Sequence, residues 1–257
     1  MESTLNHILF GWYPYFALTV FLVGSLLRFD REQYTWKANS SQLLRRKQLV
    51  LGSVLLHVGI LVIFFGHVAG LLTPAFLFEA VGISKGFKQG MAIVVGGTAG
   101  LVTLVGMVLL LHRRLYDPRI RATSSFADTA ILVILFVQLL LGLATIPLSL
   151  GHMDGSKMVL FMSWAQGILT LQPGASAYVA NVHPIFKLHL FLGLTIFLVF
   201  PFTRLVHIWS APVWYLGRRG YQIVRTKKPV VAQVGQPATK GAGSIPARPV
   251  PAAQPAE

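Results

Sequence analysis

Residues 49–72 read LVLGSVLLHVGILVIFFGHVAGLL, and this stretch decides the fold class. It contains no Asp, Glu, Lys or Arg over its whole length. About 20 apolar residues are enough for an α-helix to cross the hydrocarbon core of a bilayer. The ionisable side chains in the stretch are two histidines, His57 and His67. The sequence therefore predicts a membrane-spanning helix that carries two histidines.

Four further stretches are apolar enough to span a membrane, with predicted bounds 8–27, 89–111, 127–149 and 185–208. Charged residues make up 12% of the 257 residues, roughly half of their usual share in a soluble domain. We therefore expect an all-α integral membrane protein, a five-transmembrane-helix bundle formed by residues 1–228. The Pro- and Ala-rich remainder has no apolar periodicity, which predicts a disordered tail over 229–257.

The positive charge is concentrated on one predicted side of this bundle. The formal net charge is +14. The segments after the first and third apolar stretches, with the region from Arg204 onward, hold 18 of the 22 Lys and Arg residues. Basic loops of membrane proteins usually face the cytoplasm. We therefore expect the N-terminus outside and the C-terminus in the cytoplasm. The charge then serves topology and contact with membrane lipids, and we expect no nucleic acid as a partner.

The residues before the first apolar stretch include no Lys or Arg. A cleavable signal peptide normally begins with a basic segment, so we expect the first stretch to be retained as a helix. The chain also has no cysteine, which rules out disulfides, cysteine-held iron–sulfur clusters and covalent C-x-x-C-H haem attachment within it. Any redox cofactor held here would be non-covalent and ligated by His or Met.

Four of the eight histidines lie inside predicted spans: His57, His67, His189 and His207. Ionisable residues in a span are costly to bury and indicate function. His189 and His207 are 18 residues apart, which is five whole turns of a helix, so we expect both to face the same way. The antiparallel order of the two helices pairs His57 with His207 on the inner side, and His67 with His189 on the outer side. The separations along the two helices differ, and Pro201 is a candidate site for a bend.

Two bis-histidine pairs suit two b-type haems. A single histidine in a span is more often a hydrogen-bonded polar residue, and zinc usually requires three or four clustered ligands. On the helix that carries His57 and His67, glycines recur as Gly52, Gly59 and Gly66. Their missing side chains would make room equally well for a flat macrocycle or for a packed neighbouring helix.

Two polar or amphipathic segments outside the histidine helices carry further expectations. Residues 156–170 form an amphipathic pattern too short to span, typical of a helix on the outer surface that roofs a site. Ser125 and Asp128 match the start of a helix, where Ser caps free amides and Asp favours the helix dipole. We therefore expect Asp128 to be part of a cap and not a buried charge.

Several short runs are distinctive, and some of them fall in loops that hydrophobicity alone does not fix. They are Gln33-Tyr-Thr-Trp36, His57-Val-Gly-Ile60, Gly66-His67, Leu72-Thr-Pro74, Gly151-His-Met-Asp-Gly155 and Arg204-Leu-Val-His-Ile-Trp209. Together they resemble the gamma subunit of respiratory nitrate reductase, over about residues 10–225.

The resemblance implies a dihaem cytochrome b of the bacterial inner membrane that oxidises quinol near the periplasmic face. Electrons would then pass to an iron–sulfur beta subunit and a molybdenum-containing alpha subunit in the cytoplasm. The implied ligands are His57 and His207 for the inner, proximal haem, and His67 and His189 for the outer, distal haem. The implied quinol site lies beside the distal haem, near Gly66.

A lysine in the outer loop before the third helix belongs to that quinol site in the family. Lys88 fits the pattern best, and Lys85 is the alternative; without the resemblance, Lys88 reads equally well as an interfacial anchor. Two other functions remain open from the sequence. One is a dihaem subunit of another reductase, of the heterodisulfide or sulfite type, and the other is a haem-free transporter or anchor.

Overall fold

The computed structural model describes residues 3–36, 44–151, 153–211 and 217, and it places almost all of them in helices. No strand occurs in these ranges. Five helices are long and apolar enough to cross a membrane: Thr4–Arg31, Arg46–Leu72, Lys85–Tyr116, Phe126–Leu150 and Pro184–Phe202. The prediction of an all-α fold with five spanning helices is therefore confirmed. The predicted tail, 229–257, lies outside the described residues.

The first and second spans each contain a π-helical turn. The first consists of α1 (Thr4–His7), the π turn η1 (Ile8–Trp12) and α2 (Tyr13–Arg31), followed by the short 3₁₀ segment η2 (Gln33–Thr35). The second consists of α3 (Arg46–His67) and the π turn η3 (Val68–Leu72). It ends before Pro74, which lacks the amide hydrogen that a continuing helix needs. Both spans are longer than the apolar stretches predicted, because helical hydrogen bonding continues into polar residues.

The connection after η3 is not an irregular loop. It contains α4 (Ala75–Ala80), and α5 (Lys85–Tyr116) begins directly after Ser84, whose hydroxyl accepts a hydrogen bond from the amide of Phe87. Lys85 and Lys88 therefore lie on the first turn of a helix. The short α6 (Pro118–Ala122) leads to α7 (Phe126–Leu150). The amphipathic helix predicted over 156–170 is present as α8 (Ser156–Leu169), and it is followed by η4 (Ala175–Val179).

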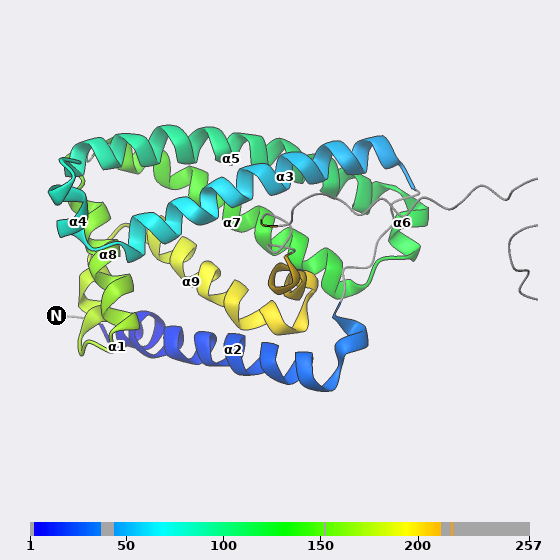
Figure 1. Ribbon diagram of the computed structural model, residues 1–257, viewed down its shortest axis with the longest axis horizontal. Coiled ribbons are helices and arrows are strands. Elements are labelled where there is room, and N and C mark those ends of the chain that lie inside the picture. Colours follow the sequence, from blue (N-terminus) through cyan, green and yellow to red (C-terminus); the bar gives the residue numbers. More distant parts are fainter. Residues whose placement is uncertain (1–2, 37–43, 152, 212–216, 218–257) are drawn as a thin grey trace, which may run out of the picture. The chain divides into compact units, whose positions relative to one another are not determined.

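The spans pack in the order α3, α5, α7, α9 and α2, each against the next. In Figure 1, α3 (cyan-blue) and α5 lie along one edge of the bundle, α2 (blue) lies along the other, and α9 (yellow) lies between. The second span therefore packs on α5, and the fifth span packs on α7 and α2. The second and fifth spans face each other across the bundle.

Glycines bring α3 and α5 into backbone contact. A Cβ atom at Gly106 on α5 would lie 2.5 Å from the amide nitrogen of Leu56 and 2.8 Å from the carbonyl oxygen of Gly52. A Cβ at Gly59 would collide with the side chain of Thr103. Such close approach is typical of small residues in membrane helices. Gly52 and Gly59 therefore serve helix packing, whereas the Cβ position of Gly66 faces open space.

The fifth span departs from the expected continuous helix over 185–208. The α-helix α9 (Pro184–Val199) ends before Pro201 and is followed by two 3₁₀ segments, η5 (Phe200–Phe202) and η6 (Arg204–Ser210). Between them Thr203 is extended, with φ −121° and ψ 178°. In Figure 1 the chain turns at the end of α9, and η6 (dark gold) is seen nearly end-on. The inference that His189 and His207 share one helical face was therefore wrong.

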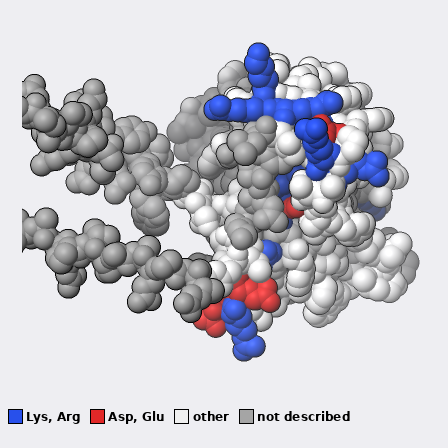
Figure 2. All heavy atoms as spheres, turned by 90° about the vertical axis from the view of Figure 1, so that its right-hand side faces the viewer, with Lys and Arg blue, Asp and Glu red and all other residues white. Residues whose placement is uncertain are grey.

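Lys and Arg side chains gather at the end of the bundle where α6 lies, which we call the basic end. Figure 2 looks onto this end, where blue side chains spread over the face and red ones are few. The described basic residues of this end are Arg28, Arg31, Arg45, Arg46, Lys47, Arg113, Arg114, Arg119, Arg121 and Arg204. The opposite end, formed by α1, α4 and α8, is called the α8 end.

Candidate functional site

Two pairs of histidines face each other across the space between the second and fifth spans. The ring centroids of His67 on α3 and His189 on α9 are 6.2 Å apart, with an angle of 44° between the ring planes. Those of His57 on α3 and His207 on η6 are 6.3 Å apart, with an angle of 68°. These are the same two pairs that the antiparallel order of the helices indicates.

Three of these rings are oriented by backbone carbonyls. Nδ1 of His57 donates to Ser53 O (2.7 Å), Nδ1 of His67 to Ile63 O (2.8 Å) and Nδ1 of His207 to Arg204 O (2.6 Å). A proton on Nδ1 leaves the lone pair of Nε2 free. Histidines that bind a metal usually donate their other ring N–H in this manner. The hydrogen bonds therefore prepare Nε2 of each ring as a ligand.

His189 is held differently from the other three. Its Nδ1 is buried without a hydrogen-bond partner in the structure. The ring packs on the backbone of α7, where a Cβ at Gly142 would lie 3.0 Å from its Cε1. Gln138, one turn away on α7, donates from Nε2 to the carbonyl oxygen of His189 (3.1 Å). The sequence does not reveal that Gly142 and Gln138 contact this histidine, because no pattern in it shows which face of α7 meets α9.

Each pair supplies two histidine ligands, which suits a metal whose other ligands come from a cofactor. Within the described residues there is no group of three or more His, Cys, Asp or Glu side chains that could hold a metal ion. A metal–imidazole bond is about 2 Å long, so two imidazoles on opposite sides of one metal have ring centres roughly 6 Å apart. The centroid separations of 6.2 and 6.3 Å agree with that arrangement. The residues present therefore fit axial ligation of a planar macrocycle by each pair.

Lys88 lies next to the π turn that follows His67. Its Nζ donates to the carbonyl oxygen of Gly70 (3.0 Å) and to Sδ of Met162 on α8 (3.2 Å). The ammonium also lies 3.7 Å from the ring centre of Phe78, within the range of a cation–π interaction. These contacts hold one positive charge at the α8 end beside the His67–His189 pair.

Lys85, the alternative lysine, points elsewhere. Its Nζ lies 3.8 Å from Oε1 of Glu79, and both side chains are 57% exposed. Both lysines border a small hollow of about 20 Å³ under α8, where Met158 and Met162 also line the wall. Of the two lysines, Lys88 makes the hydrogen bond to the turn after His67.

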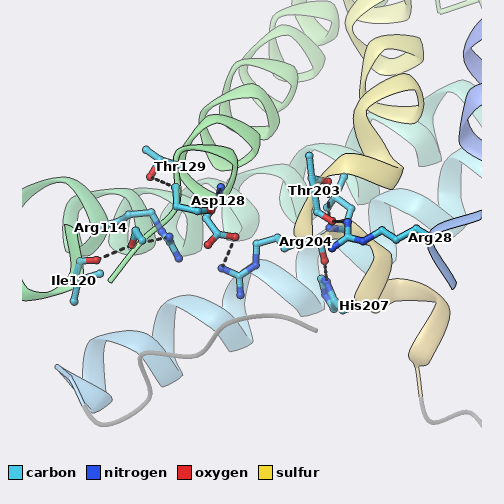
Figure 3. Close-up of polar contacts among 11 residues, drawn as sticks. Arg28, Arg114, Ile120, Asp128, Thr129, Thr203, Arg204 and His207 are labelled. Carbon is cyan, nitrogen blue, oxygen red and sulfur yellow. Dashed lines mark hydrogen bonds and ion pairs between the residues drawn. The ribbon is translucent and has the colours of Figure 1, made fainter. Parts of the chain in front are cut away.

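Polar contacts at the basic end surround the turn that carries His207 (Figure 3). Ser125 caps α7 as predicted, with its Oγ accepting from the amide of Asp128 (3.1 Å). The expectation that Asp128 is not a buried charge was wrong. Its side chain is buried and its Oδ1 lies 3.9 Å from Nη1 of Arg204. A cleft of about 420 Å³ opens beside this pair and is also lined by Arg28 and Thr203.

A family model described as "Nitrate reductase gamma subunit" matches residues 6–227 of the chain. The chain belongs to the nitrate reductase gamma subunit family. It is 53% identical to the respiratory nitrate reductase 1 gamma chain of Escherichia coli (strain K12) over 223 residues, which cover 87% of this chain and 98% of the relative. The respiratory nitrate reductase 2 gamma chain of the same strain is 51% identical over 228 residues, covering 89% and 100%.

A more distant member of the gamma subunit family comes from Bacillus subtilis (strain 168). This nitrate reductase gamma chain is 39% identical over 222 residues, which cover 86% of this chain and 99% of the relative. The family resemblance of the short motifs is thereby confirmed. With its five spanning helices, the chain is a multi-pass membrane protein and belongs to a family of subunits of an oxidoreductase complex.

Proposed function

We propose that this chain is the quinol-oxidising, dihaem cytochrome b subunit of a quinol:nitrate oxidoreductase. The observation that carries the proposal is the presence of two facing histidine pairs, 6.2 and 6.3 Å between ring centres, in a member of the gamma subunit family. One pair lies toward the α8 end and the other toward the basic end. Ligands at these two levels suit transfer of electrons across a membrane.

Each pair would hold one b haem without covalent attachment. His57 and His207 would ligate the proximal haem, and His67 and His189 the distal haem. A haem held by two histidines would supply one-electron chemistry, and its iron would have no open position for a substrate. The carbonyls of Ser53, Ile63 and Arg204 support this role, because they fix the tautomer of three of the four rings.

We place the quinol site at the α8 end, beside Gly66, His67 and Lys88. Quinol oxidation yields a quinone, two protons and two electrons. The Lys88 ammonium would donate a hydrogen bond to a quinol oxygen and stabilise negative charge while the protons leave. Its contacts with Gly70, Met162 and Phe78 hold it next to the turn after His67, which favours Lys88 over Lys85 for this role.

The orientation follows from the basic end. We place it in the cytoplasm and the α8 end at the periplasmic face of the bacterial inner membrane. Protons are then released outside, and electrons leave at the basic end. With no cysteine in the chain, an iron–sulfur beta subunit has to accept them and pass them to a molybdenum-containing alpha subunit. The exposed Lys and Arg residues of the basic end would face these partners: Arg31, Arg45, Arg46, Lys47, Arg119 and Arg121.

The absorption spectrum of the purified complex tests the proposal. We expect a Soret band, two b-type haem components that titrate separately, and low-spin signals typical of bis-histidine ligation. The subunits that co-purify should include a nitrate-reducing molybdenum protein. Absence of a Soret band would contradict the proposal and favour a haem-free anchor, whereas co-purification with a different reductase would change the acceptor and leave the haem assignment intact.

Replacement of Lys88 by alanine should lower quinol-dependent nitrate reduction roughly 100-fold, the lower range for loss of a group that assists proton transfer. Both haems should remain, because Lys88 is not a ligand. The measurement is turnover with a quinol analogue in membranes, normalised to haem content. Lys85→Ala is the matched control, because it removes the same charge from the same helical turn. The ion pair lost with it, to Glu79, is exposed, so turnover should change little. A large loss for Lys85→Ala with normal turnover of Lys88→Ala would move the site to Lys85.

A further inference from the structure

The turn between α9 and η6 determines where His207 lies. If α9 continued as a straight helix, His207 would be about 27 Å along the axis from His189. Their partners on α3 are separated by only about 15 Å along that helix. The pairing with α3 therefore requires the fifth span to change direction, and it does so from Phe200 to Thr203. The contacts that hold this turn also position the His207 ring.

One face of α2 supports the turn. Phe21, Gly24 and Arg28 follow each other at intervals of three and four residues, so they share a helical face. The ring centre of Phe21 lies 4.8 Å from that of Phe200. At Gly24, a Cβ would lie 2.8 Å from Cγ of Pro201, so the proline ring packs directly on the backbone of α2.

Arg28 binds the turn through its backbone carbonyls. Nη1 donates to the carbonyl oxygens of Pro201 (2.6 Å) and Thr203 (2.9 Å), and Nη2 donates to the carbonyl oxygen of Thr35 (2.8 Å). Hydrogen bonds from a charged guanidinium are short and strong, and its planar fork restricts the direction of each acceptor. Arg28 thus ties the carbonyl groups before and after the extended residue Thr203 to α2; Figure 3 shows the Arg28 side chain reaching Thr203.

The next residue connects this anchor to the histidine. The carbonyl oxygen of Arg204 accepts the hydrogen bond from Nδ1 of His207 (2.6 Å). The side chain of Arg204 extends to Asp128 on α7 (3.9 Å). A shift of the backbone at Thr203 would therefore move the acceptor that orients the His207 ring. By contrast, His189 is positioned by α7 through Gly142 and Gln138.

We propose that Arg28 is a positioning residue of the inner histidine pair: by holding the carbonyls of Pro201 and Thr203, it fixes the turn from which His207 meets His57. It thereby controls the haem at the basic end and leaves the one at the α8 end unaffected. The inference rests on the proposed function in one respect, because it takes the two pairs as haem ligands.

The test compares variants of the full-length chain in membranes that contain its complex. In Arg28→Gln, the affinity for the proximal haem should fall roughly 10- to 100-fold, as for other groups that orient metal ligands. The proximal haem that remains should have a shifted redox potential and altered low-spin signals, and the distal haem should keep both. Arg28→Lys should restore part of the proximal signal, because an ammonium can still donate to one of the carbonyls. Arg31→Gln is the control, since it removes an exposed charge from the same last turn of α2 and should leave both haem spectra unchanged.

Gly24→Ala provides a second, uncharged variant. The added methyl would press against the ring of Pro201, so the same selective change of the proximal haem is expected. Unchanged potentials and content of both haems in Arg28→Gln would overturn the inference and leave the proposed function intact. Equal loss of both haems would also overturn it, because the role would then be general folding. A His207→Ala chain that keeps both haems would instead refute the proposed function itself.

Discussion

Replacement of His57 by alanine is expected to remove the proximal haem and to leave the distal haem in place. The substitution deletes one of the two histidines that would hold this haem; the ring of the other, His207, is 6.3 Å away between centroids. His67 lies about 15 Å further along α3 and keeps its own partner, His189. The glycine face that packs α3 on α5 is unchanged, so the helix should stay in position. Redox-titrated absorption spectra of membranes should show one of the two b-haem components missing.

The functional consequence of His57→Ala should be close to complete. With one haem absent, quinol-dependent nitrate reduction should fall to background, whereas nitrate reduction by an artificial donor that reaches the partner subunits directly should persist. His207→Ala should remove the same spectral component, and His67→Ala and His189→Ala should remove the other one. If His57→Ala or His207→Ala left both components intact, the assignment of the inner pair would be wrong.

Replacement of Gly106 by leucine should prevent α3 and α5 from packing. The first side-chain carbon alone would lie 2.5 Å from the amide nitrogen of Leu56 and 2.8 Å from the carbonyl oxygen of Gly52. Both are backbone atoms, which cannot move aside as a flexible side chain can. We expect a destabilisation of about 3 kcal/mol or more, the upper range for overpacking. Both haems should be lost together, because α3 supplies one histidine to each pair.

The amount of the chain in membranes, and its thermal unfolding in detergent, measure this effect. Gly96→Leu is the matched control on the same helix, because no atom lies within 4 Å of the Cβ position of Gly96. That variant should change the free energy of unfolding by less than about 0.5 kcal/mol. Equal accumulation and equal haem content of the two variants would contradict the role assigned to Gly106.

The hydrophobic stretches were sufficient to predict the five spans, because the length needed to cross a bilayer is fixed. The turn in the fifth span was harder to predict from the sequence. Pro201 indicated a bend, but its direction depends on Gly24 and Arg28. These residues lie far away in the sequence, in another span. The shared face expected for His189 and His207 from five whole turns was therefore wrong. The antiparallel order of the helices was enough to indicate the pairs, because it depends only on which end of each helix a histidine is near.

Other errors have the same origin in contacts between distant segments. The pattern at Ser125 and Asp128 predicted a cap, and the cap is present. Burial of the Asp128 carboxylate depends on Arg204, which a local pattern does not contain. In the same way, the sequence left open whether Gly59 and Gly66 serve packing or a cofactor. Only the position of α5 distinguishes them, since it covers Gly59 and leaves the Cβ position of Gly66 in open space.

The two spans that supply the histidines should differ in their tolerance of inserted or deleted residues. His57 and His67 lie on one uninterrupted α-helix, Arg46–His67. A residue inserted between them would rotate one ring by about 100° relative to the other and shift it by about 1.5 Å, so that His57 and His67 could not both keep their partners. Between His189 and His207 the α-helix is already interrupted at Phe200–Thr203. A change of length there would not rotate His189, and it would affect only the inner pair, because Arg28 holds this turn in position. Among gamma subunits, a change in chain length should therefore be excluded between the first two histidines, whereas between the last two it should affect the inner pair alone.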